Sequence, residues 1–411
     1  MNGNGPLSGK VVIDLTVALA GPYATLILAG LGARVIKVEQ PGTGDMARKN
    51  APYLTSEGLR LHSSNADDMS VSMMIRGRGK ESVTLDLKSA AGREVLFDLV
   101  RRADVLVQNF SAGVAERLGV DYSTIAEVNP RLVYVSISGF GEGSDPGRKA
   151  MDTVIQGLSG IMFTSGSESD GPIRVGIPIA DLTAPLFGVI GALAAMQHAD
   201  RAGEGQHVDV SMLGALTSLV AAEGLDAMDR LGMPTRTGDH LPRLAPFGTF
   251  QTKGGWISIC APTDQQAGGV LAAIGRPELA HDRDFATRDA RVANSTRLHA
   301  IVAGWAAEQE LSGALAILAE NGVPSEVVRG PHEAIRDPEV LARDEIVPLE
   351  HPVINDVGGL LGPGLPIVFS RGTAGLRRPA PPLGAHTADV LRDFLSFSPE
   401  RISALREAGT T

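Results

Sequence analysis

Short apolar runs alternate with helical patterns over the first 140 residues of the chain. The runs with strand character are residues 11–15, 34–39, 83–87, 105–107 and 132–137. Helical periodicity fills the intervals between them, as at residues 22–31 and 91–102. Strands that are apolar on both faces and separated by helices predict an α/β fold, a doubly wound, mostly parallel, Rossmann-like sheet.

Ligands on a sheet of this kind bind beyond the carboxyl ends of its strands. The loops that should lie at that edge are residues 16–21, 40–45, 108–113 and 138–147. We therefore expect the functional site of this part of the chain among these loops.

At 411 residues the chain exceeds one average domain, so we expect two. Residues 1–225 should form most of a large α/β domain. Residues 226–335 begin with a Gly- and Pro-rich linker and continue with a hairpin pattern and helices, which predicts a smaller α+β domain. Residues 336–411 are predicted to return to the large domain, because they are too few to build a core of their own.

The charge balance and the cysteine content narrow the class of protein. Lys and Arg total 37 against 47 Asp and Glu, a net charge of −10, which disfavours a nucleic-acid partner. The lone cysteine, Cys260, leaves no internal disulfide and no cysteine-based metal cluster, and it fits a cytoplasmic protein. No histidine pair has metal-ligand spacing, and no apolar run is long enough to predict a membrane span, so neither a metal nor a membrane is expected.

A Rossmann-type nucleotide-binding protein or dehydrogenase is one alternative from outside the enzyme class favoured below. Glu39 ends the second strand, where such proteins bind a ribose, but the loop at residues 16–21 has one glycine instead of G-x-G-x-x-G. The basic segment from Arg76 through Arg78 to Lys80 could contact a phosphate or could be a solvated turn. These residues alone leave the alternative open.

Asp181 lies between an apolar, proline-containing run and a long helical pattern that begins at Leu182. Taken locally, its best interpretation is a helix N-cap, because an aspartate oxygen readily accepts a hydrogen bond from a free backbone N–H of the first turn. Asp152 also precedes a helical stretch and allows the same interpretation. Only the wider sequence gives either carboxylate a chemical role.

Motifs in a fixed order along nearly the whole chain resemble one enzyme family. They include Ala20-Gly-Pro22, Leu31-Gly-Ala-x-Val-Ile-Lys-Val-Glu39, Arg78-Gly-Lys80, Leu85-Asp-Leu-Lys88, Ser138-Gly-Phe-Gly141, Ala180-Asp181, Gly203-x-Gly-Gln206 and Pro382-Leu-Gly-x-His-Thr387. In order and spacing they resemble the class III CoA-transferases, the family of formyl-CoA and carnitine CoA-transferases, to which the α-methylacyl-CoA racemases are related.

The resemblance implies that Asp181 is a nucleophile. In the family, the matching aspartate attacks an acyl-CoA thioester, forms a mixed anhydride and then an aspartyl-CoA thioester, and passes CoA to a free carboxylic acid. No permanently bound cofactor is implied, because coenzyme A enters and leaves as a thioester. The resemblance also implies an interlocked homodimer and places Asp152 near the substrate.

The resemblance further implies where CoA binds on the large domain. The matching positions are Ala18, Leu19, Ala20, Leu85, Lys88, Asn109, Phe110, Arg117, Leu118, Lys149 and Met212. On charge alone, Lys88, Arg117 and Lys149 are expected phosphate partners.

Racemisation is the alternative within the family. Racemases that resemble this chain carry a histidine directly before the acid that matches Asp152, whereas this chain has Met151, which cannot take a proton. Two other departures concern transferases: Gln40 stands where an arginine often contacts CoA, and Ala385 replaces the glutamate of the C-terminal motif. The sequence therefore favours CoA transfer over racemisation and leaves the acyl group and the acid unspecified.

Overall fold

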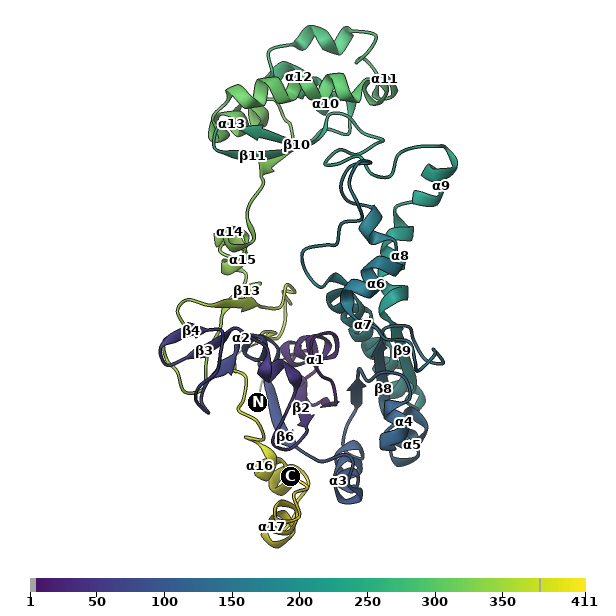
Figure 1. Cartoon of the computed structure of the whole chain (residues 1–411), viewed down its shortest axis with the longest axis vertical. Helices are drawn as coiled ribbons and strands as arrows, with labels where there is room; N and C mark the ends of the chain where they lie inside the picture. Colours follow the sequence, from purple (N-terminus) through teal and green to yellow (C-terminus); the bar gives the residue numbers. More distant parts are fainter. Residues whose placement is uncertain (1–4, 377) are drawn as a thin grey trace. The chain divides into compact units, whose positions relative to one another are not determined.

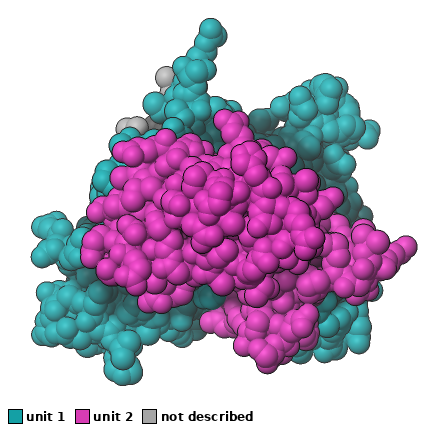
Figure 2. All heavy atoms as spheres, turned by 90° about the horizontal axis from the view of Figure 1, so that it is seen from above, with its two compact units in different colours: residues 1–159, 176–219, 335–411 teal, residues 160–175, 220–334 magenta. Residues whose placement is uncertain are grey.

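The computed structural model describes residues 5–376 and 378–411. The chain divides into two compact units (Figure 2). The first comprises residues 1–159, 176–219 and 335–411, and the second comprises residues 160–175 and 220–334. Every candidate site residue named above belongs to the first unit, so the site can be described within it.

A six-stranded parallel sheet forms the centre of the first unit (Figure 1). In spatial order its strands are β6 (Lys80–Thr84), β2 (Arg34–Glu39), β1 (Val11–Asp14), β7 (Val105–Gln108), β8 (Val133–Ser138) and β9 (His207–Ser211). Every neighbouring pair is parallel, which confirms the predicted large parallel sheet. In chain order the strands run 3-2-1-4-5-6, so the direction of winding reverses between β1 and β7, where sheets of this kind bind ligands.

The third strand lies three residues earlier than predicted. We expected residues 83–87, but β6 is Lys80–Thr84. The polar start of this strand, Lys80 and Glu81, resembles a loop in sequence, and Lys80 is nevertheless buried. The predicted strand began too late because Lys80 was taken for a surface residue.

Helices separate the strands along the chain. They are α1 (Ala20–Gly30), α2 (Val71–Arg76), α3 (Ala90–Val100), α4 (Val114–Leu118), α5 (Tyr122–Val128), α6 (Asp152–Leu158), α7 (Ile179–Ala202) and α8 (Met212–Ala222). A short 3₁₀ turn at Met46–Lys49 and the small antiparallel sheets β4-β3-β5 (Gly58–Arg60, Tyr53–Thr55, Met69–Ser70) and β13-β14 (Ile346–Pro348, Leu361–Pro363) complete this part.

The end of the chain contributes to the core of the first unit. Val390, Leu391 and Leu395 are buried in the same apolar cluster as Ile13 of β1 and Leu96 of α3. They lie in and beside α16 (Thr387–Asp389) and a π-helical turn, Val390–Phe394, after which α17 (Pro399–Glu407) ends the chain. The first unit therefore needs residues from both ends of the sequence.

Helix α7 is long and apolar enough, by length and composition, to cross a membrane, the one such helix in the described part of the chain. Half of its most apolar window is buried inside the protein. It packs against α1, β8 and β9 of the first unit. A core helix of a parallel sheet has the same length and composition, so this observation carries no conclusion about membranes.

The second unit contains a three-stranded antiparallel sheet, β10-β11-β12 (Phe247–Thr252, Gly255–Cys260, Ser325–Val327). Its helices include α9 (Leu225–Arg230), α10 (Asp264–Ala273), α11 (Arg288–Ala293), α12 (Ser295–Glu308) and α13 (Leu311–Glu320). The hairpin of β10 and β11 lies where the sequence pattern predicts it. Apolar residues of α12 and α13, such as Leu298 and Leu318, form a core with Ile257 and Ile259 of β11. The short helix α14 (Pro331–Ala334) ends this unit, and α15 (Pro338–Ala342) belongs to the last segment of the first unit.

A stacked pair of histidines lies in the second unit, with His299 buried and His240 half-buried. The rings of His240 and His299 stack with their centroids 3.9 Å apart, and the backbone N–H of Phe247 donates to Nε2 of His299 (3.2 Å). Burial and the neighbouring His240 lower the pKa of His299, Asp239 opposes them, and the resulting pKa is about 4. The folded second unit therefore holds His299 in the neutral form.

This pair predicts acid sensitivity of the second unit. The folded pKa of His299 lies below the ordinary value of 6.5, so its contribution to stability is present above pH 6.5 and is lost as the pH falls towards about 4. Both tryptophans, Trp256 and Trp305, belong to this unit, so tryptophan fluorescence reports its thermal unfolding. We expect the unfolding midpoint to fall over this range and His299→Gln to flatten the fall. The matched control is His62→Gln, at an exposed histidine of the first unit; an equal flattening there would contradict the assignment.

Candidate active site

The loops that follow β1 and β7 meet at the point where the winding of the sheet reverses. The side chain of Asn109 holds them together, because its Oδ1 accepts from the backbone N–H of Val17 (2.8 Å) and its Nδ2 donates to the Val17 carbonyl (2.9 Å). This paired contact fixes the loop after β1 against the end of β7.

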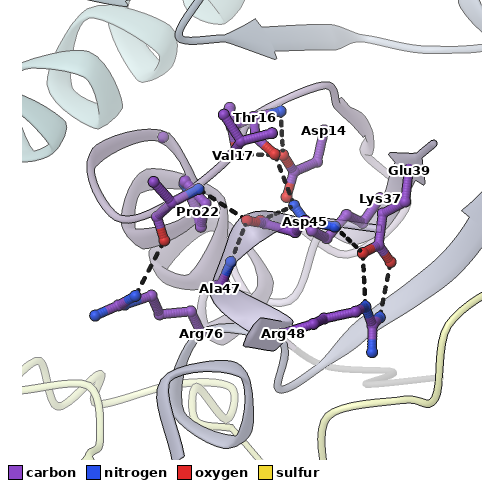
Figure 3. Close-up of polar contacts among 12 residues, drawn as sticks. Asp14, Thr16, Val17, Pro22, Lys37, Glu39, Asp45, Ala47, Arg48 and Arg76 are labelled. Carbon is purple, nitrogen blue, oxygen red and sulfur yellow. Dashed lines mark hydrogen bonds and ion pairs between the residues drawn. The ribbon is translucent and has the colours of Figure 1, made fainter. Parts of the chain in front are cut away.

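Two buried ion pairs lie beneath the same loop, and Figure 3 labels the residues of one of them, Lys37 and Asp45. Lys80 of β6 pairs with Asp14 of β1 (2.9 Å), and Lys37 of β2 pairs with Asp45 (2.8 Å). All four side chains are almost fully buried. Lys37 Nζ also donates to the carbonyl of Thr16 (2.7 Å). Each buried charge thus has an opposite charge beside it, and together the two pairs connect β1, β2 and β6 to the loop.

Ala18 occupies the left-handed region of the backbone map, with φ of 67°. This conformation is costly for a residue with a Cβ and persists only where neighbouring contacts enforce it. Here the backbone N–H of Ala18 donates to Oδ1 of Asp45 (2.9 Å), and its carbonyl accepts from Nη1 of Arg76 (3.0 Å). Asp45 and Arg76 therefore hold Ala18 in this conformation, which is typical of backbone at a functional site.

Glu39 does not occupy a ribose-binding position. It is buried, and its two oxygens accept from Nε and Nη2 of Arg48 (both 2.8 Å). They also accept from the hydroxyl of Ser82 (2.6 Å) and from the backbone N–H of Asp45 (3.0 Å). A buried carboxylate that already accepts four hydrogen bonds is not available to bind a ribose. The acidic residue at the end of β2, which suggested a dinucleotide-binding protein, is therefore explained by its structural contacts.

The basic segment is neither a phosphate site nor a solvated turn. Lys80 and Arg78 are buried, and Arg78 donates to the carbonyls of Ile75 and Pro363. Arg76, at the end of α2, is half-buried and points to the loop at Ala18 (Figure 3). Sequence reasoning missed its position, although Ser70 and the apolar residues after it predict a short helix that ends here.

Asp181 is not the cap of its helix. Helix α7 begins at Ile179, so Asp181 lies inside the first turn, and its N-cap position is Pro178, which has no side chain to accept a hydrogen bond. Asp152 supplies the cap instead, since its Oδ1 accepts from the backbone N–H groups of Ala180 (2.8 Å) and Asp181 (3.3 Å). Gln156 donates to the other oxygen of Asp152 (2.7 Å). The capping interpretation thus holds for Asp152, which caps α7 rather than its own helix α6.

The carboxyl group of Asp181 is left available by this arrangement. Burial and the nearby carboxylate of Asp152 raise its pKa, the guanidinium of Arg76 opposes both effects, and the resulting pKa is about 6. Within residues 5–376 and 378–411, no group donates a hydrogen bond to its oxygens. Because α7 lies between β8 and β9 in the chain, its first turn lies at the carboxyl edge of the sheet. Asp181 is thus a half-buried, mostly ionised carboxylate at the edge where a ligand is expected.

Comparison with known proteins identifies the family. The family model described as CoA-transferase family III matches residues 7–387. The chain belongs to this family. The acetyl-CoA:oxalate CoA-transferase of Acetobacter aceti is 37% identical over 395 residues, which cover 95% of this chain and 96% of that protein. The succinate–glutarate CoA-transferase of Agrobacterium fabrum is 33% identical, with coverage of 95% and 96%. A solved CAIB/BAIF family protein of Brucella suis is 33% identical and superposes with a TM-score of 0.81 over 95% of this chain and all of that one. The protein is a CoA-transferase.

The predicted CoA contacts of the transferase lie after the strands of the large sheet. Ala18, Leu19 and Ala20 follow β1, Leu85 and Lys88 follow β6, Asn109 and Phe110 follow β7, Lys149 follows β8 and Met212 follows β9, while Arg117 and Leu118 lie on α4. Ala20, Leu85 and Met212 are buried, so they offer a ligand little side-chain surface. Lys88, Arg117 and Lys149 are exposed and free to meet phosphates. Binding of CoA by these residues stays a prediction.

A cavity of about 480 Å³ opens beside the ends of β7, β8 and β9. Phe110 lines it, together with Ser136, Glu142 and His207. Nε2 of His207 lies 2.8 Å from the hydroxyl of Ser136, and Nδ1 of His207 lies 3.1 Å from the carboxylate of Glu142. Asp181 is not among its lining residues. No cluster of three or more metal-ligating side chains occurs in the described part of the transferase.

The raised pKa of Asp181 predicts that its ionisation destabilises the folded transferase. Its folded pKa is raised to about 6, so ionisation destabilises the folded state above that pH, and the penalty disappears as the pH falls below the ordinary value near 4. We expect Asp181→Asn to stabilise the protein by about 1 kcal/mol at pH 8, allowing for partial screening, and to have no such effect at pH 4. Thermal unfolding of both proteins at both pH values tests this. A variant that is less stable at pH 8 would show that the carboxylate has an unrecognised partner.

Proposed function

We propose that the enzyme moves CoA from an acyl-CoA thioester to a free carboxylic acid through covalent intermediates on Asp181. The observation that carries this proposal is the state of the Asp181 carboxyl group, which is accessible, has no hydrogen-bond donor among the described residues and has a pKa raised to about 6. It is ionised near pH 7 yet more basic than an ordinary aspartate. A carboxylate nucleophile needs both properties.

The first half of the reaction transfers CoA to the enzyme. A carboxylate oxygen of Asp181 attacks the thioester carbonyl, the C–S bond breaks, and CoA leaves as a thiolate from a mixed anhydride. The thiolate then attacks Cγ of Asp181 and breaks the anhydride C–O bond. The donor acid departs as a carboxylate with an oxygen that came from Asp181, and an aspartyl-CoA thioester remains.

The second half reverses these steps with a different acid. The acceptor carboxylate attacks Cγ, the C–S bond breaks, and the thiolate then attacks the carbonyl carbon of the acceptor. Asp181 is released as a carboxylate that keeps one oxygen of the acceptor. No proton is gained or lost in this sequence, so it requires no general base; this fits Met151, an exposed residue without a titratable group, beside Asp152.

The substrates that we propose are acyl-CoA thioesters and organic acids of intermediary metabolism, with short dicarboxylic acids as the first acids to test. Similar proteins are named for oxalate, for succinate and glutarate, and for mesaconate. Coenzyme A enters as a thioester and is not a permanent cofactor. It would lie along the loop at Ala18 and across Asn109 and Phe110. The exposed side chains of Lys88, Arg117 and Lys149 would surround its phosphates. The single cysteine, Cys260, fits a cytoplasmic location.

The covalent mechanism predicts an adduct on one residue. Incubation with a suitable acyl-CoA and no acceptor should leave a hydroxylamine-sensitive CoA thioester on Asp181, detectable by mass spectrometry. Asp181→Ala should lose exchange entirely, whereas Asp170→Ala, at an exposed aspartate of the second unit, should keep it. An acceptor acid labelled with ¹⁸O should pass label into the donor-derived acid in later turnovers. Full exchange by Asp181→Ala would refute the mechanism, and α-proton exchange in deuterated water would instead indicate racemisation.

We also propose that the enzyme is a homodimer whose chains interlock, as the family resemblance implies. Leu186, Phe187, Ile190 and Leu193 form an exposed apolar stripe on α7, with Ile190 62% exposed. Their spacing places them on one helix face. A continuous apolar stripe on a helix that begins at the candidate active site is typical of a buried interface.

Interlocking predicts unusual kinetics of subunit exchange. Sedimentation should give a dimer at every concentration, because interlocked chains separate only by unfolding. Two differently tagged preparations should therefore form no mixed dimers when combined in the native state, but should form them after joint denaturation and refolding. Rapid native exchange would argue for a simple dimer, and sedimentation as a monomer would refute the dimer altogether.

A further inference from the structure

An acid substrate must bring a negative charge to a site that already holds one. The carboxylate of Asp152 lies close enough to Asp181 to raise its pKa, whereas Asp181 itself is an uncharged thioester when the acceptor attacks. Like charges at short range repel, and the half-buried setting of Asp181 weakens solvent screening of that repulsion. The proposed function therefore requires a cation beside Asp181.

Arg76 is the cation that meets this requirement. Among the described residues it is the one positive group that acts on the pKa of Asp181. Burial lowers the pKa of Arg76 itself, and Asp45 and Asp181 oppose that effect. No ion pair joins Arg76 to Asp181 among the described residues, so the guanidinium acts across a space and not through a direct bond.

The hydrogen bonds of Arg76 leave part of its guanidinium available. Nη1 donates to the carbonyl of Ala18 (3.0 Å), which fixes the side chain in place. A guanidinium has five N–H donors, and neither Nε nor Nη2 of Arg76 has a partner in the described part of the protein. Two donors in a fixed fork match the two oxygens of one carboxylate.

The other cations beneath the loop cannot take this role. Lys37 and Lys80 are paired with Asp45 and Asp14, and Arg48 is paired with Glu39. Each of these contacts neutralises a carboxylate that would otherwise be buried without a partner. A substrate could recruit one of these cations only by breaking a buried ion pair.

We propose that Arg76 binds the reacting carboxylate of the acid substrate beside Asp181. The proposal rests on the function proposed above and adds a residue to it. Arg76 would hold one oxygen of the acceptor while the other attacks Cγ of the aspartyl-CoA thioester and the C–S bond breaks. In the first half of the reaction the same contact would hold the departing donor carboxylate. Because the contact is to the reacting carboxylate, it should serve monocarboxylic and dicarboxylic acids alike.

The test measures how the preformed adduct is discharged. The aspartyl-CoA enzyme is prepared from acyl-CoA, freed of small molecules and mixed with increasing concentrations of acid, so that the discharge rate reports only the second half of the reaction. For Arg76→Met we expect the half-saturating acid concentration to rise roughly 10- to 100-fold, because the substrate loses a charge-assisted hydrogen bond. Arg76→Lys should lie between wild type and Arg76→Met. Lys49→Met, at an exposed cation of the 3₁₀ turn, is the matched control and should resemble wild type.

A pH profile separates this role from simple support of the Ala18 loop. Arg76 opposes the rise in the pKa of Asp181, so its loss should move the acid limb of activity from near pH 6 to higher pH, whereas loss of loop support would not. Arg76→Gln can still donate to the Ala18 carbonyl and serves if Arg76→Met folds poorly. The proposal would be overturned if the variants kept both the wild-type half-saturating concentration of the acid substrate and the wild-type pH profile. Weaker binding of dicarboxylic acids alone would assign Arg76 to the distal carboxylate instead. If the wild type forms no adduct, the proposed function fails and not this inference alone.

Discussion

The two buried ion pairs beneath the loop after β1 are the constraint on which the site depends. Asp14 with Lys80 and Lys37 with Asp45 connect the three neighbouring strands β1, β6 and β2 to one another and to Asp45. Removing one member of such a pair leaves an unpaired buried charge, which typically costs about 3–5 kcal/mol. These pairs are weak evidence for stability but strong evidence for register, because charges that must meet permit only one arrangement of strands and loops.

The same constraint reaches Asp181 through a short series of contacts. Asp45 accepts from the backbone of Ala18, Arg76 donates to the carbonyl of that residue, and the charge of Arg76 acts on Asp181. The C-terminal segment adds support from the other side, since Ser82 bonds Glu39 and also accepts from the backbone of Gly384. A substitution far from Asp181 in sequence can therefore alter its environment through the Ala18 loop.

The sequence predicted the parts of the structure that follow from apolar patterning. Strands that are apolar on both faces predicted the parallel sheet, whereas Asp181 became a candidate nucleophile only through the family resemblance. It could not predict the contacts of buried polar residues, because Lys80, Glu39 and Arg76 look like surface residues until their partners are known. Those partners are far apart in the sequence: 66 positions separate Lys80 from Asp14, and 58 separate Arg76 from Ala18. Asp152 was an equally good capping residue in sequence, but only the fold shows that it caps α7.

The opposing effects of Asp152 and Arg76 give the carboxyl group of Asp181 an intermediate pKa. A more basic carboxylate attacks a thioester faster, but one that is protonated at pH 7 cannot attack at all. Burial and Asp152 raise the pKa of Asp181, and Arg76 limits the rise, so that it stays at about 6. In the mechanism that we propose, Asp181 must also leave from the anhydride with the acceptor, which a strongly basic carboxylate does slowly. A pKa slightly above that of an ordinary aspartate would keep attack and departure comparable, as that mechanism requires.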